Sequence, residues 1–162
     1  MNSDFYSDSF CFLAFDESNP EHVRALENLL SDPLVDEYFN SLESNLEGDS
    51  DFWDSAYLVS NYDSIVGYLA FFMDAREAEL HYAVVPEFRG IRNNSNETIG
   101  CQIVREASTG LFSRCKSLKC LKLMIDKSNI RSTKAAIRAG YKQVSKGLYN
   151  KFVLSREDAM HL

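Results

Sequence analysis

Apolar residues in the first third of the chain predict one strand followed by two helices. The run 10–15 is short, apolar and rich in aromatic residues, which is typical of a strand. Asn19 and Pro20 favour a helix start, and the apolar residues after them recur at helical spacing as far as Leu30. The segment 33–46 has apolar residues at four-residue steps, so we expect a second helix there.

The middle of the chain has the pattern of consecutive strands. The segments 56–60 and 65–73 are rich in apolar, β-favouring residues. Polar turn-forming residues at 61–64 join them, which predicts a hairpin. A further strand is expected at 78–85, where Pro86 ends it.

Two helices and three strands are predicted for the remainder. Apolar residues recur at helical spacing over 98–112 and alternate with other residues over 118–125, which indicates a helix followed by a strand. A helix over 129–138 and two strands, 141–144 and 148–154, complete the order.

This order of elements predicts a mixed α/β fold. Consecutive hairpins followed by one β-α-β crossover require only the two strands beside the 98–112 helix to run parallel. We therefore expect a mostly antiparallel sheet of six to seven strands. Ser128 or Asn129 caps the last long helix, and Gly140 stands where a left-handed C-cap is needed.

Length and composition favour one domain. The chain has 162 residues, 45% of them hydrophobic, and no repeat or Pro/Gly-rich linker divides it. Its longest apolar runs, such as Ile65 to Met73, are far shorter than the roughly 20 residues that span a bilayer, and Met1 to Ser9 is acidic. We therefore expect a cytoplasmic protein without a membrane span or a leader.

The cysteines and histidines do not form a metal-binding pattern. No CxxC pair is present, and no histidine stands at metal-ligand spacing beside a cysteine. We expect no metal site, and free thiols in a reducing compartment. The residues are Cys11, Cys101, Cys115, Cys120, His22, His81 and His161.

The net charge of -7 divides unevenly along the chain. Residues 1–75 hold sixteen acidic residues and one basic residue, whereas 76–162 hold eight acidic and sixteen basic residues. Two interpretations stay open. In the first, the charged residues only form solvated surfaces. In the second, residues 76–162 bind a small polyanion while residues 1–75 line a site for a cation. The acidic first part argues against nucleic acid.

Two local motifs resemble the GCN5-related N-acetyltransferase family. The segment from Val84 to Ile91 reads V-V-P-E-F-R-G-I, which is similar to the family's strand-to-helix passage V-x-P-E-[YF]-R-G. The second motif begins at Asn129, with a small residue three positions on and Gly140-Tyr141 eleven and twelve positions on. These offsets match those of the family, and a strand is predicted before each motif.

The resemblance covers roughly 56–153 and implies a mixed sheet with helices on both faces. It implies one domain, 1–162, with an acyl-CoA-binding core at 56–153 and a variable acceptor side at 1–55. The implied activity is transfer of an acetyl group from acetyl-CoA to a primary amine. The first alternative is a protein of the same fold with weak or no catalytic activity, which acts as an acyl-CoA-binding or regulatory module. A more distant alternative is a nucleic-acid-binding, antitoxin-like partner protein.

The glycine-rich loop departs from the family pattern. The family's Arg/Gln-x-x-Gly-x-Gly/Ala begins here at Arg89, but without a gap its glycine positions fall on Arg92 and Asn94. If 92–97 is an insertion, Thr98-Ile99-Gly100 takes those positions and the helix register is kept. We prefer the insertion, and we expect the helix start to offer its free N–H groups to the CoA diphosphate.

The resemblance also places the pantetheine arm of the cofactor. In the family the arm lies between two splayed parallel strands and hydrogen-bonds to exposed backbone, here that of Val84 and Val85, with Asn129 on its other side. Asn129 and Ser132 also fit simple helix capping. The residues assigned to cofactor binding are Val84, Val85, Arg89, Gly90, Ile91, Arg92, Thr98, Ile99, Gly100, Asn129 and Ser132.

Transfer to an amine needs a base and a proton for the leaving thiolate. Glu79 and His81 alternate onto one face of the 78–85 strand, and either is a candidate base. Family members often have a tyrosine as acid seven residues after the motif asparagine, where this chain has Ala136. Tyr141 and Tyr149 are the candidate substitutes.

The acceptor is inferred from charge alone. Acidic residues cluster on the predicted acceptor side and favour a cationic amine or a basic peptide. They are Asp32, Asp36, Glu37, Glu43, Glu47, Asp49, Asp51 and Asp54. The oligomeric state stays open, with a homodimer as one alternative.

Overall fold

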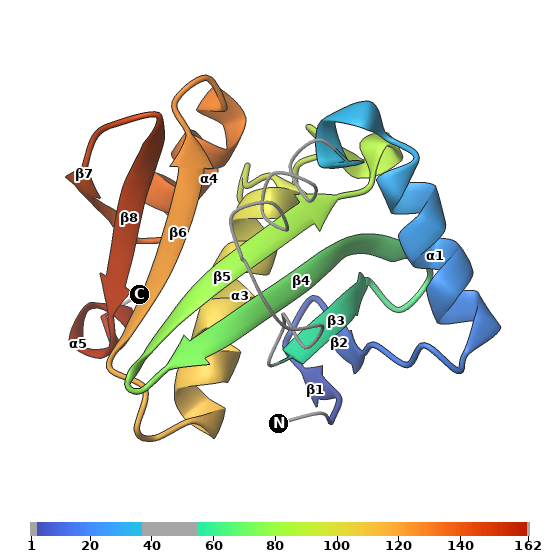
Figure 1. Ribbon diagram of the computed structural model, residues 1–162, viewed down its shortest axis with the longest axis horizontal. Coiled ribbons are helices and arrows are strands. Elements are labelled where there is room, and N and C mark those ends of the chain that lie inside the picture. The colour runs from blue at the N-terminus through green and yellow to red at the C-terminus, as the bar shows by residue number, and fades with distance from the viewer. Residues whose placement is uncertain (1–2, 37–54, 162) are drawn as a thin grey trace.

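The computed structural model describes residues 3–36 and 55–161, and within them one mixed sheet dominates (Figure 1). It has eight strands in the order β1-β2-β3-β4-β5-β6-β8-β7, and only β5 and β6 pair in parallel. The strands are β1 (Phe5–Tyr6), β2 (Cys11–Ala14), β3 (Ser55–Ser60), β4 (Ile65–Asp74), β5 (Glu77–Val84), β6 (Cys120–Asp126), β7 (Lys142–Ser145) and β8 (Tyr149–Ser155). The predicted mixed fold is confirmed, with one strand more than the six to seven expected.

The helices lie where the periodicity predicted them, with two additions. They are α1 (Pro20–Leu30), a 3-10 turn η1 (Pro86–Phe88), α3 (Ile99–Arg114), α4 (Ile130–Arg138) and α5 (Arg156–Ala159). The short η1 and α5 were not expected. Residues 33–36 are helical, as predicted, and the rest of the predicted 33–46 helix lies outside the described residues.

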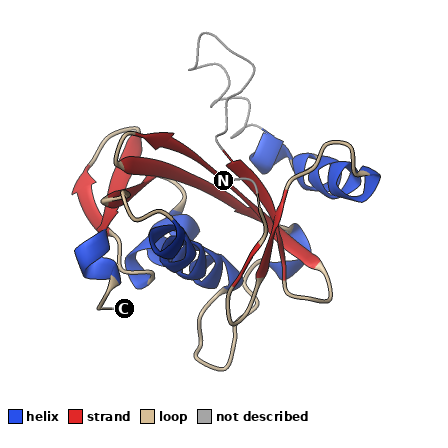
Figure 2. Cartoon of the chain, turned by 90° about the horizontal axis from the view of Figure 1, so that it is seen from below, coloured by secondary structure: helices blue, strands red, loops and turns tan. Residues whose placement is uncertain are grey.

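Helices cover both faces of the twisted sheet (Figure 2). One face packs against α3, α4 and α5, with Ile103 and Phe152 among its fully buried residues. The other face packs against α1, where Leu29 lies in a smaller cluster with Leu58 and Tyr68. No helix within 3–36 or 55–161 combines the length and the apolar character that a membrane span requires.

Local signals in the sequence account for the helix ends. The Asn19 side chain accepts from the Glu21 N–H at the start of α1, and Asn129 accepts from the Ser132 N–H at the start of α4. Gly140 has a φ of 90° just after α4, which is the left-handed C-cap that the sequence predicted. The hairpin at 61–64 is also present, with the Asn61 N–H donating to the Ser64 carbonyl at 3.1 Å.

Arg156 joins the end of α3 to the last helix. Its guanidinium donates to the carbonyls of Leu118 and Phe112 at 2.8 Å each, and to the carbonyl of Cys115. Its Cζ also lies 5.0 Å from the ring centroid of Phe112. Because the last carbonyls of a helix have no partner within the helix, this one side chain satisfies groups that water would otherwise have to reach.

We expect Arg156→Lys to lower the free energy of unfolding by about 2–4 kcal/mol, because an ammonium lacks the planar fork that reaches three carbonyls. Urea denaturation measures the change. Arg131→Lys, at an exposed position of α4, is the matched control and should change it by less than about 0.5 kcal/mol. Equal stabilities of the two variants would contradict the bracing role of Arg156.

Candidate functional site

The strands β5 and β6 diverge, and this opening is the centre of the candidate site. Their parallel pairing covers only Glu77–Glu79 against Cys120–Lys122. Beyond that point β5 stays paired with β4 as far as Val84, and β6 stays paired with β8 as far as Asp126. Figure 1 shows the two strands running apart from their shared end toward the start of α3.

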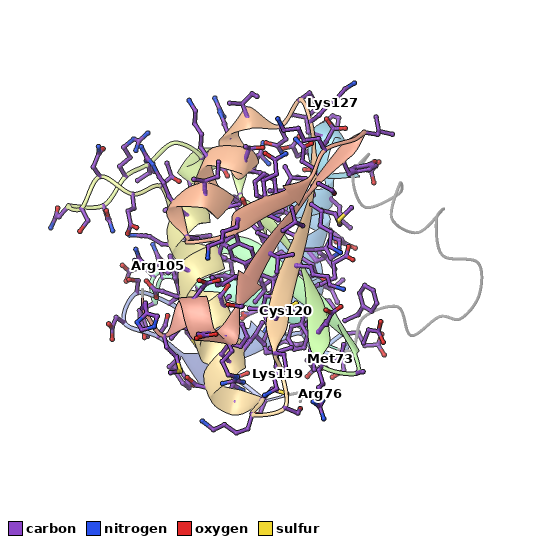
Figure 3. The ribbon with its side chains drawn as sticks, turned by 90° about the vertical axis from the view of Figure 1, so that its left-hand side faces the viewer. Met73, Arg76, Arg105, Lys119, Cys120 and Lys127 are labelled. Carbon is purple, nitrogen blue, oxygen red and sulfur yellow. The ribbon has the colours of Figure 1, made fainter. Side chains whose placement is uncertain are left out.

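The closed end of the opening is fixed by backbone contacts. The Lys119 N–H donates to the Arg76 carbonyl at 2.6 Å, directly before the parallel ladder begins. Figure 3 shows Arg76, Lys119 and Cys120 at this end of β6 and Lys127 at the other end. The opening therefore widens toward the first residues of α4.

Backbone groups of β5 face the opening without a strand partner. The Val85 N–H donates to the Val66 carbonyl at 2.9 Å, which directs residue 85 toward β4. Successive residues of a strand direct their N–H and C=O groups to opposite sides, so those of Val84 and Tyr82 face β6. The parallel ladder has ended before both residues. Val84 was a predicted binding residue, whereas Val85 has its N–H on the other side.

The first turn of α3 stands at the open end and is partly covered. Thr98 caps the helix by accepting from the Cys101 N–H at 3.4 Å, and the Ile99 N–H donates to the Ile91 carbonyl at 3.3 Å. Within the described residues the Gly100 N–H has no hydrogen-bond partner. One amide of this turn is thus free, and the Cys101 amide makes only a long contact.

The loop before α3 is closed at its base, at the place where the helix register predicts an insertion. Arg92 and Thr98 form an isolated antiparallel bridge, so the chain leaves and returns at the same place. The segment between them is exposed and hydrogen-bonded to itself, with the Asn93 N–H donating to the Glu97 carbonyl at 2.9 Å. It projects from the body of the molecule in Figure 3.

The arginines of this region are engaged within the protein. Arg89 donates from Nε to the Val84 carbonyl at 2.9 Å, and its Nη1 lies 2.5 Å from Asp32 Oδ2. Arg92 donates to the Asn96 carbonyl at 2.7 Å. Burial alone raises the pKa of Asp32, but the Leu34 N–H and the Arg89 guanidinium outweigh it and hold that pKa below its usual value. Asp32 is therefore ionised and paired.

The face of β5 that packs toward α1 carries the two candidate bases. His81 is buried and donates from Nε2 to Glu79 Oε1 at 3.0 Å, whereas the Glu79 side chain is 26% exposed. Both side chains lie on one face of β5, as the alternation predicted. Glu79 is also the last β5 residue in the parallel ladder, so its carboxylate stands at the point where the strands part.

The first turn of α4 lies across the opening from β5. Asn129 accepts from the Ser132 N–H at 3.1 Å through Oδ1, which is the capping role that the sequence allowed. Ala136, one turn further on, is fully buried. Of the two candidate tyrosines, Tyr141 is buried and shares a 2.8 Å hydrogen bond with Ser108 in the interior. Tyr149 pairs with Asp126 at the end of β6.

Tyr82 also borders the opening, and the sequence reasoning did not single it out. Its ring reaches the first turn of α3, where Tyr82 Cε2 would lie 3.5 Å from a Cβ at Gly100. Its hydroxyl forms a hydrogen bond with Ser132 of α4. Burial raises the pKa of Tyr82 to about 12, although the Ser132 hydrogen bond lowers it. Its position two residues before Val84 was the available signal, since alternate residues of a strand share a face.

The acidic acceptor side is described only in part. Asp32 is paired with Arg89, and Asp36 is exposed. The other six acidic residues of the prediction lie outside the described residues. A shallow cavity of about 360 Å³ lies against α1, and its lining includes Glu21, Arg24 and Val85.

All four cysteines are free thiols. Among residues 3–36 and 55–161, no three histidine, cysteine or carboxylate side chains are grouped as a metal site.

No family model and no curated protein sequence matches the chain. The crystal structure of the Campylobacter jejuni N-acetyltransferase PseH with acetyl coenzyme A matches with a TM-score of 0.66 at 18% identity, over 91% of this chain and 99% of PseH. A chimera of spermidine N-acetyltransferase SpeG from Vibrio cholerae and hSSAT matches with a TM-score of 0.68 at 13% identity, over 96% and 100%. A Salmonella typhimurium acetyl transferase that modifies the N-terminal serine of ribosomal protein L7/L12 matches with a TM-score of 0.64 at 18% identity, over 92% and 96%. The chain therefore has the fold that its two motifs predicted.

Proposed function

We propose that this chain, which has the fold of the GCN5-related N-acetyltransferases, transfers an acetyl group from acetyl-CoA to a primary amine. The observation that carries the proposal is the opening between β5 and β6, with the start of α3 at its open end. An extended ligand with amide groups and a diphosphate fits such a place, because strand backbone and a helix start bind those groups.

Different residues of the opening bind different parts of the cofactor. The N–H groups of Tyr82 and Val84 bind the pantetheine arm as an added strand would, and the Asn129 side chain faces it from α4. The diphosphate lies at the Gly100 N–H, beside the short turn formed by Gly90 and Ile91 and the returning Thr98 and Ile99. Arg92 is near this turn and supplies positive charge.

Glu79 accepts the proton that the amine loses, directly or through water. Its partial exposure favours it over His81, which is buried behind it and orients the carboxylate through the 3.0 Å contact. A free backbone N–H of β5 stabilises the oxyanion that forms on the thioester carbonyl.

The acceptor is a cationic primary amine, such as a polyamine, an aminoglycoside or a basic peptide. The acidic first part of the chain supports this class. The matching structures include a spermidine N-acetyltransferase, and an aminoglycoside acetyltransferase in complex with coenzyme A and kanamycin. Asp32 is not free to bind such a cation while Arg89 holds it. A reducing, cytoplasmic setting suits the four free thiols.

The alternative is an acyl-CoA-binding or regulatory module without turnover. The partly covered helix start and the engaged Arg89 favour it. Calorimetry with acetyl-CoA, followed by a transfer screen over neutral and cationic amines, separates the two. Binding with turnover supports the transferase, and binding without turnover supports an acyl-CoA-binding module. No binding at high micromolar concentration contradicts the transferase and supports a regulatory module.

We expect Glu79→Gln to lower kcat by about 100-fold or more, because it removes the proton acceptor and keeps the shape of the side chain. The acetyl-CoA dissociation constant should stay within about threefold of the wild-type value, which corresponds to a change of less than about 1 kcal/mol in binding free energy. Glu87→Gln, at an exposed position of η1, is the matched control. Unchanged turnover in Glu79→Gln would remove Glu79 as the base.

A further inference from the structure

Lys151 of β8 lies on the open face of the sheet beside Glu79 and has no ion-pair partner among residues 3–36 and 55–161. We infer that Lys151 binds an anionic group of the acceptor while the acceptor amine meets Glu79. The acceptor is then a primary amine that also carries a carboxylate or a phosphate. The inference rests on the proposed transferase function and narrows its acceptor class, because only a peptide among the acceptors named above carries both groups.

The open face is formed by β5, β6 and β8 on the side of the sheet away from α3. Leu123 and Phe152 point to the other side, into the core that α3 and α4 cover. Met124 and Lys151, their neighbours in the chain, therefore point to the open face, where both are half-buried. Within the described residues, no helix covers β6 or β8 on this side. In Figure 1 this face is turned toward the viewer, with α3 behind the sheet.

The strand register sets three side chains in a line across the open face. Glu79 is opposite Lys122 at the last step of the parallel ladder. Met124 comes two residues later on β6 and lies opposite Lys151 of β8. Paired residues of neighbouring strands direct their side chains to the same face. A carboxylate, an apolar side chain and an ammonium therefore follow one another over β5, β6 and β8.

The other two lysines of the open face have partners. Lys122 forms an ion pair with Glu77. Lys142 forms one with Asp158 at 2.6 Å. Lys151 makes neither an ion pair nor a side-chain hydrogen bond within 3–36 and 55–161, so an anionic ligand displaces no described partner. Its charge acts on this face, since the pKa of Glu77 is lowered chiefly by the Lys122 hydrogen bond and further by the Lys151 ammonium.

The acceptor that fits this line has three parts. Its amine lies at Glu79, which takes the proton, and its anionic group accepts hydrogen bonds from the Lys151 ammonium. An apolar spacer between them packs on Met124. The backbones of Glu79 and Lys151 are two strand spacings apart, about 10 Å, and the long lysine side chain shortens this span. Lys151 takes part only in binding, so the transfer reaction itself is unchanged.

The test compares three acceptors that differ at the end remote from the amine, namely 5-aminopentanoate, pentylamine and 1,5-diaminopentane. At saturating acetyl-CoA, we expect the wild-type kcat/KM for 5-aminopentanoate to exceed that for pentylamine by about tenfold, the size expected for one charged hydrogen bond on a half-exposed face. Lys151→Gln should bring this ratio close to one, and Lys151→Arg should keep it. Lys151→Glu should favour 1,5-diaminopentane instead, because the charge at this position is reversed.

A matched control and a second anion make the result specific. Lys146→Gln, in the exposed turn between β7 and β8, should leave the ratio unchanged. Comparison of 3-aminopropyl phosphate with 5-aminopentanoate shows which anion is preferred. A wild-type protein that acetylates amines without an anionic group equally well or better would overturn the inference and leave the proposed transfer intact, as would an unchanged ratio in Lys151→Gln. Acetylation of no amine by the wild type would overturn the proposed function itself.

Discussion

Replacing Gly67 by alanine should destabilise the protein more than the same change at any other glycine within residues 3–36 and 55–161. A Cβ at this position would lie 2.5 Å from the Ala83 carbonyl oxygen and 3.1 Å from Ile103 Cδ1. The first of these atoms is backbone of β5, so β4 and β5 must separate to make room. We expect the free energy of unfolding to fall by about 3 kcal/mol, within the range for overpacking a core, and the melting temperature to fall by roughly 6–12 °C.

Urea and thermal denaturation measure this change, and Gly147→Ala is the control. A Cβ at Gly147 would meet only the Tyr149 carbonyl oxygen at 3.4 Å, in an exposed turn. We expect that variant to stay within about 0.5 kcal/mol of the wild type. A Gly67→Ala protein as stable as the Gly147→Ala protein would contradict the close packing of β4, β5 and α3.

Local patterns predicted most of the fold because most of its elements are formed by local signals. The hairpin at 61–64 has polar turn residues, and α4 has both Asn129 and Gly140 at its ends. Strand β1 was missed because its two residues are held by pairing with β2, through Phe5 opposite Phe12. Helix α5 is a single turn capped by Ser155, which is too short for periodicity to reveal.

The candidate site was predictable where it depends on alternation. Alternation placed Glu79 and His81 on one face. The insertion inferred from the helix register stays a prediction for the loop that the Arg92–Thr98 bridge closes. The Arg89–Asp32 pair was not predictable, because it joins distant segments through tertiary packing. Tyr82 was overlooked because its role depends on where β5 and β6 part, which the pattern of a single strand does not show.

The first turn of α3 can be tested by adding a negative charge to it. We expect Gly100→Asp to weaken acetyl-CoA binding by about 100-fold or more, since a carboxylate about 4–5 Å from a diphosphate costs roughly 3–4 kcal/mol near a surface. Calorimetry at low salt measures the loss. Because surface charges are screened by ions, the loss should shrink as salt is raised.

Three controls separate charge from shape and from fold. Gly100→Ala should bind acetyl-CoA as the wild type does, since a Cβ there would meet Tyr82 and Val84 at an ordinary 3.5 Å. Ser113→Asp adds the same charge at an exposed position near the other end of α3 and should also bind normally. S-acetylpantetheine, which lacks the diphosphate, should bind equally to Gly100→Asp and wild type. If Gly100→Asp loses this ligand as well, the opening itself has changed, and if it keeps full affinity for acetyl-CoA, the diphosphate does not lie at the start of α3.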